Sequence, residues 1–160
     1  MTKVLGVDPG LGATGFSLLK QAKKKTSLIA YGLIKPPIKS TIERRLSYLF
    51  IEMSKVIDKF TPSTLAIEDA FYSKNVKSAM RLGQARGVII LAAAQANIDV
   101  FEYAPRKVKQ SVCGNGAASK EQIQFMVMNI LNLKKKQKSL DISDAMSVGI
   151  CYLNQFRIKL

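Results

Sequence analysis

The sequence contains no histidine and, among its 160 residues, only two cysteines. The absence of histidine excludes imidazole as a general base, the Ser-His-Asp and Cys-His nucleophile systems, and histidine-ligated metal sites. Cys113 and Cys151 lie far apart and form no C-x-x-C pair, so neither a disulfide framework nor a zinc site is indicated. Any catalysis would therefore use carboxylates, lysines or metal ions that prefer oxygen ligands.

Acidic residues are also scarce. The chain has 25 Lys and Arg against 11 Asp and Glu, a formal net charge of +14 and a pI of about 9.9. Such a charge indicates a polyanionic partner, of which nucleic acid is the foremost candidate. The longest apolar run, residues 87–96, is shorter than a bilayer span, and no basic-then-apolar signal opens the chain. We therefore expect a soluble, cytoplasmic protein with no membrane partner.

The length predicts a single domain over residues 1–160, because 48% hydrophobic residues can fill one sizeable core. Apolar patterning predicts strands at 3–8, 14–20, 27–34, 63–68 and 98–103. It predicts helices over about 46–60, 76–96, 120–131 and 141–153. Pro105 is expected to end the last strand, and Gly114 and Gly116 to form a loop. This order predicts an α/β sandwich with a mixed sheet.

The segment 7–16, VDPGLGATGF, has the G-x-G-x-x-G spacing of a dinucleotide-binding loop. That motif requires a helix after the glycines, whose N-terminus holds the pyrophosphate. Here two predicted strands follow, joined by a lysine-rich turn at 22–25, so a hairpin is expected instead. Asp8, directly before the glycines, would also repel a phosphate unless a metal ion lay between them. The segment thus raises the possibility that Asp8 is a metal ligand.

Two other patterns are open to more than one interpretation. Gly83 and Gly87 lie four residues apart on one face of a predicted helix, which suits either internal packing or a dimer interface. The lysines at 22–25 are interpreted as a solvated loop tip, and those at 134–138 as a basic connector before the last helix.

Four acids are the candidates for chemistry. Asp8 and Glu68 each close an apolar strand, while Asp141 and Asp144 lie three residues apart at the start of a helix. Taken singly, each is explained as a turn acid, a helix cap or a first-turn acid. Taken together in a chain with few acids, they indicate a site for divalent cations, and all-oxygen ligands favour Mg²⁺ or Mn²⁺.

Several motifs resemble those of the RuvC family of bacterial Holliday junction resolvases, which belong to the RNase H-like superfamily. They are LGVDPGLGATGF at 5–16, IEDAFYSKN at 67–75, LGQARG at 82–87, VFEYAPRKVKQSVCGNGAASK at 100–120 and DISDA at 141–145. The resemblance runs nearly from end to end. It implies an RNase H-like fold with a mixed five-stranded sheet flanked by helices.

The resemblance also implies an activity. Positions matching Asp8, Glu68, Asp141 and Asp144 hold two metal ions in that family, which we expect to be Mg²⁺ with Mn²⁺ as a substitute. Some relatives have histidine at the position of Asp141. The implied reaction is a pair of nicks in strands of like polarity, each by in-line attack of water on a phosphodiester. Asp69 should stay out of the site, since neighbours in a strand point to opposite faces.

Contacts to DNA are implied by the same resemblance. Phe71 matches an aromatic residue that stacks on unpaired bases, and Lys109 and Lys120 match basic residues near the scissile phosphate. Weaker candidates for backbone contact are Tyr72, Lys74, Asn75 and Arg81. The alternatives are a core position for Phe71 and a solvated surface charge for each lysine. The expected partners are a four-way DNA junction and the RuvA-RuvB branch-migration complex. A homodimer is also expected, because the junction is nearly two-fold symmetric.

Three other functions compete with this interpretation. An ATP-binding protein of the actin and sugar-kinase type also places an acid before glycines, but it needs two such domains and this chain is too short. An architectural DNA-binding protein would explain the charge but would leave the four acids without a purpose. A sister nuclease that cuts RNA in hybrids would share the acids, whereas the Phe71 segment and the 100–120 motif argue for a junction.

Overall fold

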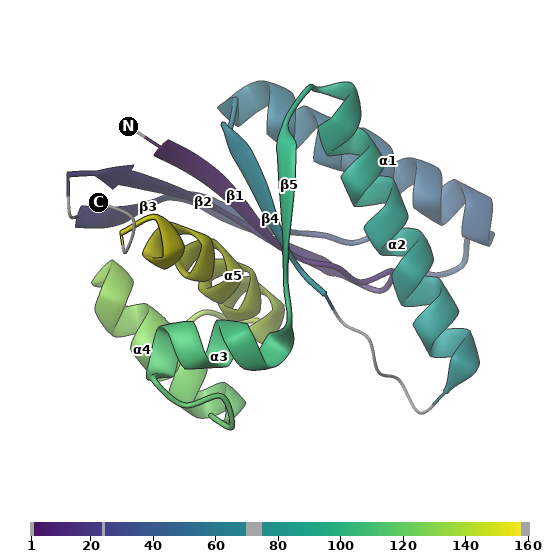
Figure 1. Cartoon of the computed structure of the whole chain (residues 1–160). Coiled ribbons are helices and arrows are strands. Elements are labelled where there is room, and N and C mark those ends of the chain that lie inside the picture. The colour runs from purple at the N-terminus through teal and green to yellow at the C-terminus, as the bar shows by residue number, and fades with distance from the viewer. Residues whose placement is uncertain (1, 24, 70–74, 158–160) are drawn as a thin grey trace.

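A central sheet organises the computed structural model, which describes residues 2–23, 25–69 and 75–157. Of residues 156 and 157 only the backbone is described. The strands are β1 (Thr2–Asp8), β2 (Thr14–Ala22), β3 (Lys25–Ile34), β4 (Thr64–Glu68) and β5 (Asp99–Tyr103). They lie in the order β3-β2-β1-β4-β5 (Figure 1). Strand β2 runs antiparallel to β1 and β3, while β4 runs parallel to β1 and β5. The predicted mixed, five-stranded sheet is confirmed.

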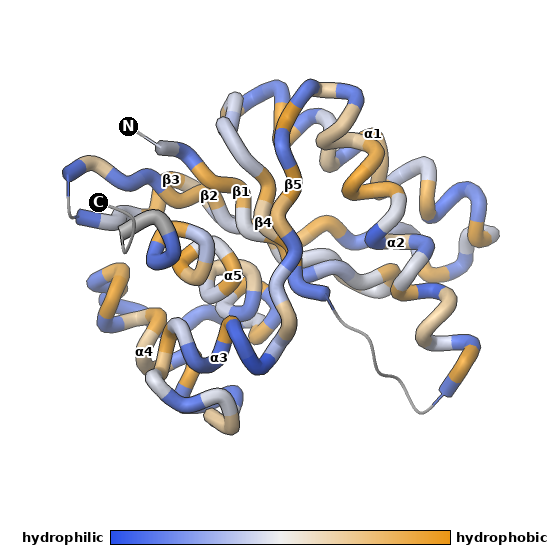
Figure 2. Tube along the Cα trace, in the orientation of Figure 1, coloured by the Kyte–Doolittle hydropathy of each residue, from blue (hydrophilic) through white to orange (hydrophobic). Residues whose placement is uncertain are grey.

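Helices cover both faces of this sheet (Figure 1). The elements α1 (Ile42–Phe60) and α2 (Val76–Gln95) pack on one face, and α3 (Pro105–Cys113), α4 (Lys120–Leu131) and α5 (Leu140–Arg157) pack on the other. Alternating strand residues divide the core accordingly, with Leu5 and Leu65 buried on the α1 side and Val4 and Ala66 on the α5 side. Figure 2 shows the hydrophobic residues concentrated along the strands and inner helix faces.

Helix α3 occupies a segment for which no helix was predicted. Pro105, expected to end the strand, is also the first residue of this helix, where its missing N–H is no disadvantage. Gly114 ends the helix in the left-handed conformation, at φ 70°. Val108 and Val112, four residues apart, form the buried face that holds the helix on the core. The Pro and Gly that were interpreted as loop signals are therefore the two ends of a helix.

The remaining elements lie close to their predicted positions. Strands β2 and β3 form the predicted hairpin, in which Ala22 pairs with Lys25, so Lys25 already belongs to β3. Ser119 caps α4 in a capping box with Gln122, as its place before the helix predicted. In the described part of the chain, no helix combines the length and the apolar character that crossing a membrane requires.

Gly83 and Gly87 on α2 face away from the core. A Cβ atom built on either glycine would meet no heavy atom of another described element within 4 Å. The internal-packing interpretation of this pair is therefore wrong for the part of the chain that the structure describes, where neither glycine makes room for a neighbouring element. Val76, Met80 and Leu91 of the same helix are also exposed, at 75%, 63% and 50%.

Candidate active site

The sheet and one helix bring the predicted acids to the same place. Strands β1 and β4 are parallel neighbours, with Val7 paired to Ile67, so Asp8 and Glu68 end at the same edge of the sheet. Helix α5 begins at Leu140 and packs across β1 and β2, which carries Asp141 and Asp144 to that edge. Segments that are distant in sequence therefore supply one cluster of carboxylates.

Glycines on the strands allow this close approach of α5. Gly15 pairs with Asp8 across the hairpin, and a Cβ atom on Gly15 would lie 2.6 Å from the carbonyl carbon of Asp141. Farther along the helix, a Cβ atom on Gly6 would lie 2.8 Å from the backbone nitrogen of Gly149. Gly15 belongs to strand β2, so no helix follows the glycine motif. Gly15, the last glycine of the motif, allows α5 to pack closely against β2. The dinucleotide-loop interpretation is therefore excluded.

A small pocket lies between these acids and the helices α3 and α4. It has a volume of about 240 Å³, and its wall contains Asp8, Glu68, Lys109, Lys120 and Asp144 together with Pro105, Val108, Ile123 and Ser147. Asp141 lies beside this wall, where the Ser139 hydroxyl donates a hydrogen bond of 3.1 Å to its Oδ2 atom. The structure thus places three of the four predicted acids and both predicted lysines in one pocket wall, and Asp141 lies near enough for its charge to act on Asp8 and Asp144.

Burial and mutual repulsion make these carboxylates hard to ionise. Burial, followed by the charges of Asp144, Glu68 and Asp141, raises the pKa of Asp8 from 3.8 to about 8, against the opposing effect of Lys120. Burial also raises the pKa of Glu68, again with help from the charge of Asp144. Burial is the main cause of the raised pKa of Asp144, to which Asp141 adds. Such a concentration of acids with raised pKa values in a pocket is typical of a functional site.

The two lysines partly balance this charge. Lys109 comes from α3 and Lys120 is the first residue of α4. The Lys120 Nζ lies 3.6 Å from the Asp144 Oδ2, and both lysines lower the pKa values of Glu68 and Asp144. Lys120 is itself 62% exposed, so its ammonium group can also reach a ligand at the mouth of the pocket.

Of the other predicted DNA contacts, only Asn75 and Arg81 belong to the described residues. Phe71, Tyr72 and Lys74 lie outside the described residues. The side chain of Asn75 caps α2 by accepting hydrogen bonds from the backbone N–H groups of Lys77 and Ser78, at 3.0 and 3.3 Å. Arg81 is exposed on the same helix.

Asp69 takes no part in the pocket, as strand alternation predicted. Its carboxylate lies 3.2 Å from Arg86 on α2, which also forms an ion pair with Glu102 of β5. The pairing ties α2 to the end of the sheet, so the role of Asp69 is structural.

Sequence reasoning missed the part that serines play around the acids. The Ser147 hydroxyl donates a hydrogen bond of 2.7 Å to the backbone oxygen of Asp144 and lines the pocket. Its position three residues after Asp144 could have placed it on the same helix face. Ser139 was hidden because its bond to Asp141 depends on the path of the chain into α5.

The donors suit a hard divalent cation. The carboxylates offer only oxygen, and no histidine or thiol from the described residues lines the pocket. Among the residues that the structure describes, no three Asp, Glu, Cys or His side chains are already gathered closely enough to hold one ion. The acids would therefore have to turn toward one another to share a cation, which would relieve their mutual repulsion.

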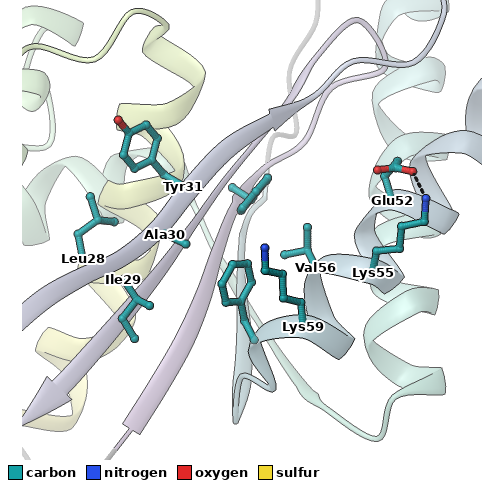
Figure 3. Close-up of a pocket in the computed structure, with 10 residues that line it drawn as sticks. Leu28, Ile29, Ala30, Tyr31, Glu52, Lys55, Val56 and Lys59 are labelled. Atoms are coloured by element: carbon teal, nitrogen blue, oxygen red, sulfur yellow. Dashed lines mark hydrogen bonds and ion pairs between the residues drawn. The ribbon is translucent and has the colours of Figure 1, made fainter.

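A larger groove lies away from this cluster, between β3 and α1 (Figure 3). It has a volume of about 620 Å³ and is lined mainly by apolar side chains, including Phe16, Ala30 and Val56. Its charged groups are Glu52 and Lys55, which pair with each other at 2.7 Å, and Lys59, which lies over the Phe60 ring. With a single carboxylate that is already paired, this groove does not offer the chemistry of the acidic pocket.

Known proteins are similar to this chain in both sequence and fold. Residues 4–152 match the sequence model of the family described as "Crossover junction endodeoxyribonuclease RuvC". A protein of that name from Natranaerobius thermophilus is 41% identical over 156 residues, covering 98% of this chain and 97% of its own length. Another from Halothermothrix orenii is 43% identical over 156 residues, covering 98% and 94%.

Solved structures agree with this match. The Thermus thermophilus RuvC in complex with a Holliday junction substrate superposes with a TM-score of 0.93 at 27% identity, covering 99% of this chain and 97% of the other. The yeast mitochondrial Holliday junction resolvase Ydc2 superposes with a TM-score of 0.72 at 11% identity, covering 99% and 82%, and so shares the fold.

Proposed function

This chain belongs to the RuvC family of crossover junction endodeoxyribonucleases, and from that premise we propose that it resolves Holliday junctions through the acidic pocket. The observation that carries the proposal is the convergence of Asp8, Glu68, Asp141 and Asp144, three of which have raised pKa values, on one edge of the sheet. Buried carboxylates that repel one another are stabilised when a cation joins them. We assign the activity to a single domain spanning residues 1–160.

Members of this family depend on a divalent metal ion. We infer that the ion is Mg²⁺, that two bind at each site and that Mn²⁺ can replace them, because all-oxygen ligands suit both cations. Such ions supply an activated water and stabilise the charge on the leaving 3′ oxygen. Asp8 and Glu68, fixed by two paired strands, would hold the ions in place, and Asp141 and Asp144 would complete the ligand set from α5.

The lysines of the pocket have a complementary role. Lys109 and Lys120 would contact the scissile phosphate, because they are the cations in the wall of the pocket and Lys120 is largely exposed. With the acids holding metal ions, Lys120 would be available to exchange its partner Asp144 for a phosphate oxygen. The family resemblance adds Phe71 as a stacking residue and Tyr72, Lys74, Asn75 and Arg81 as contacts to the DNA backbone.

We propose that the active form is a homodimer, because a four-way junction is nearly two-fold symmetric and must be cut twice. The exposed face of α2 is the surface we assign to the contact. It carries an apolar and small-residue row at helical spacing, composed of Val76, Met80, Gly83, Gly87 and Leu91. Two such faces could approach closely at the glycines. The RuvA-RuvB branch-migration complex is the proposed partner that delivers the junction, in the cytoplasm where its DNA lies.

A substrate panel tests this function. The chain would be incubated with a mobile synthetic junction, a linear duplex and an RNA-DNA hybrid in Mg²⁺, Mn²⁺, Ca²⁺ or a chelator. We expect paired nicks in the junction strands of like polarity, in Mg²⁺ and Mn²⁺, that a ligase can seal. Ca²⁺ should support binding with little cleavage, because its larger and more variable coordination sphere misplaces the water and leaving oxygen. Cleavage in the chelator, or preferred cleavage of the hybrid, would contradict the proposal.

A further inference from the structure

Lysines on two distant segments gather at the far end of α4 from the acidic pocket. The connector between α4 and α5 contains Lys134, Lys135, Lys136 and Lys138, all of which are exposed. Lys25, at the start of β3, lines a hollow together with Ile130, Leu131 and Leu133, which lie directly before these lysines. We call the five residues Lys25, Lys134, Lys135, Lys136 and Lys138 the lysine track.

The track and the active site are joined by α4. This helix starts at Lys120 in the wall of the pocket and ends at Leu131 beside Lys25 (Figure 1). The connector then returns toward the pocket, since Ser139 bonds to Asp141. Twelve helical residues span about 18 Å at 1.5 Å per residue. The lysines are therefore distributed along a path that runs from Lys138, three residues before Asp141, to Lys134 and Lys25 at the far end of α4.

The backbone of the connector is held against the protein. The buried side chain of Gln124, in the middle of α4, donates from its Nε2 to the backbone oxygen of Gln137 and to the Ser143 hydroxyl, at 3.4 Å each. Gln137 is half-buried, while its lysine neighbours point outward. This anchoring lowers the entropy that the segment would lose on binding a ligand.

The charges of the track are not balanced within the protein. Among the residues that the structure describes, the cations that form ion pairs are Lys55, Arg86 and Lys120. No residue of the track is among them. Isolated lysines on a surface are usually only solvated. Five of them along one anchored path, none in an ion pair with a described residue, form a concentrated positive potential that suits a regularly spaced polyanion.

We propose that the lysine track binds the phosphate backbone of one duplex arm of the junction, away from the cleaved bond. This inference rests on the proposed function, because it takes the DNA to be the substrate cut at the acidic pocket. DNA rises by about 3.4 Å per base pair, so the far end of the track, about 18 Å from Lys120 along α4, would contact the arm about five base pairs from the nick. The track would fix the direction of the arm without reading its sequence.

Two variants with the same loss of charge test the proposal. The first carries Lys134→Gln, Lys135→Gln, Lys136→Gln and Lys138→Gln. The matched control carries Lys35→Gln, Lys39→Gln, Lys55→Gln and Lys59→Gln, which are also exposed but lie after β3 and on α1. Junction affinity would be measured in Ca²⁺ over a range of salt concentrations, with arms of about 4 and about 12 base pairs. Melting temperatures would establish that both variants fold.

The track variant should bind the long-armed junction at least about tenfold more weakly than the parent, with a salt slope smaller by about 3, since each phosphate contact contributes about 0.9. It should lose much less affinity for the short-armed junction, whose arms reach only the lysines nearest the pocket. The control should change the slope by less than about 1. Equal losses in both variants, or a loss that does not depend on arm length, would overturn the proposal.

Cleavage separates this inference from the function on which it rests. At saturating enzyme in Mg²⁺, single-turnover nicking by the track variant should remain within about twofold of the parent. A parent that fails to nick the junction would contradict the proposed function. A parent that nicks, together with a track variant that binds long arms normally, would contradict the track alone.

Discussion

At the scale of single residues, the surroundings of Asp8 strongly disfavour its ionised form. Its pKa of about 8 has burial as the main cause, followed by the three neighbouring acids. At neutral pH, and without a cation, Asp8 therefore keeps a proton that an exposed aspartate would have lost. Binding a divalent ion would displace that proton, so metal affinity should rise with pH up to about 8.

The raised pKa of Asp8 also predicts how stability depends on pH in the presence of a chelator. Between pH 4 and 8 the folded chain holds a proton at Asp8 that the unfolded chain has released, so the free energy of unfolding should fall as the pH rises. The raised pKa values of Glu68 and Asp144 act in the same direction. Asp8→Asn should flatten this dependence and stabilise the chain at pH 8 by at least about 1 kcal/mol, since a tenfold change in proton affinity corresponds to about 1.4 kcal/mol.

Urea unfolding with chelator at about pH 5, 6.5 and 8 measures this effect. Asp58→Asn is the matched control, because Asp58 is an exposed acid on α1. The control should follow the parent at every pH. Parallel curves for the parent and Asp8→Asn would show that the folded chain does not hold a proton at Asp8.

At the scale of elements, the position of α5 relative to β1 and β2 determines whether the acids meet. Gly15→Ala should push the first turn of α5 away from Asp8, because the added methyl group would overlap the backbone of Asp141. Overpacking of this kind costs about 1–3 kcal/mol. We expect that loss of stability and a loss of nicking per folded molecule of at least about tenfold, since small displacements of catalytic groups are costly.

Gly12→Ala provides the control within the same motif. A Cβ atom on Gly12 would meet no heavy atom of the described residues within 4 Å, so this variant should change stability by less than about 1 kcal/mol and leave nicking intact. Thermal melting and single-turnover nicking of both variants distinguish the two glycines. Similar behaviour of the two variants would mean that Gly15 does not control the approach of α5.

The elements also show what the sequence can and cannot reveal. The strands were predictable because their apolar runs end at clear turn signals, and β1 and β4 could be recognised as the carriers of Asp8 and Glu68. Helix α3 was missed because Pro105 and Gly114 are typical of loops as well as of helix ends. Because this helix was not predicted, two residues that line the pocket, Pro105 and Val108, were not predicted either. The raised pKa values were equally hidden, because burial depends on packing between distant segments.

At the scale of the whole molecule, a single copy presents one acidic pocket, whereas a junction must be cut at two symmetric positions. Gly83→Glu with Gly87→Glu should weaken self-association, because the change places like charges on the exposed face of α2 that we assign to the dimer. We expect sedimentation to show a shift toward monomer. The products on a junction should change from paired nicks to single, unpaired nicks.

A control for this change is Ser47→Glu with Asn129→Glu, which adds the same charges at exposed positions of α1 and α4. The control should remain a dimer and cut in pairs. If the α2 variant also remains a dimer, the interface lies on another surface of the molecule.

The central claim is that the converging acids hold the metal ions that cut DNA, and Asp144→Asn tests it most directly. The substitution keeps the shape of the side chain but removes one negative ligand. The measurement is single-turnover nicking of a mobile junction in Mg²⁺, with junction affinity in the absence of metal and the melting temperature determined on the same preparation.

The account predicts a folded Asp144→Asn protein that binds the junction as tightly as the parent, or more tightly, because fewer carboxylates repel the phosphates. Its nicking rate should fall by at least about 100-fold, and Asp8→Asn should behave in the same way. If Asp144 were merely a first-turn helix acid, its loss would cost about 0.3–1 kcal/mol of stability and leave cleavage unchanged. Near-parental nicking by the folded Asp144→Asn protein would contradict the account.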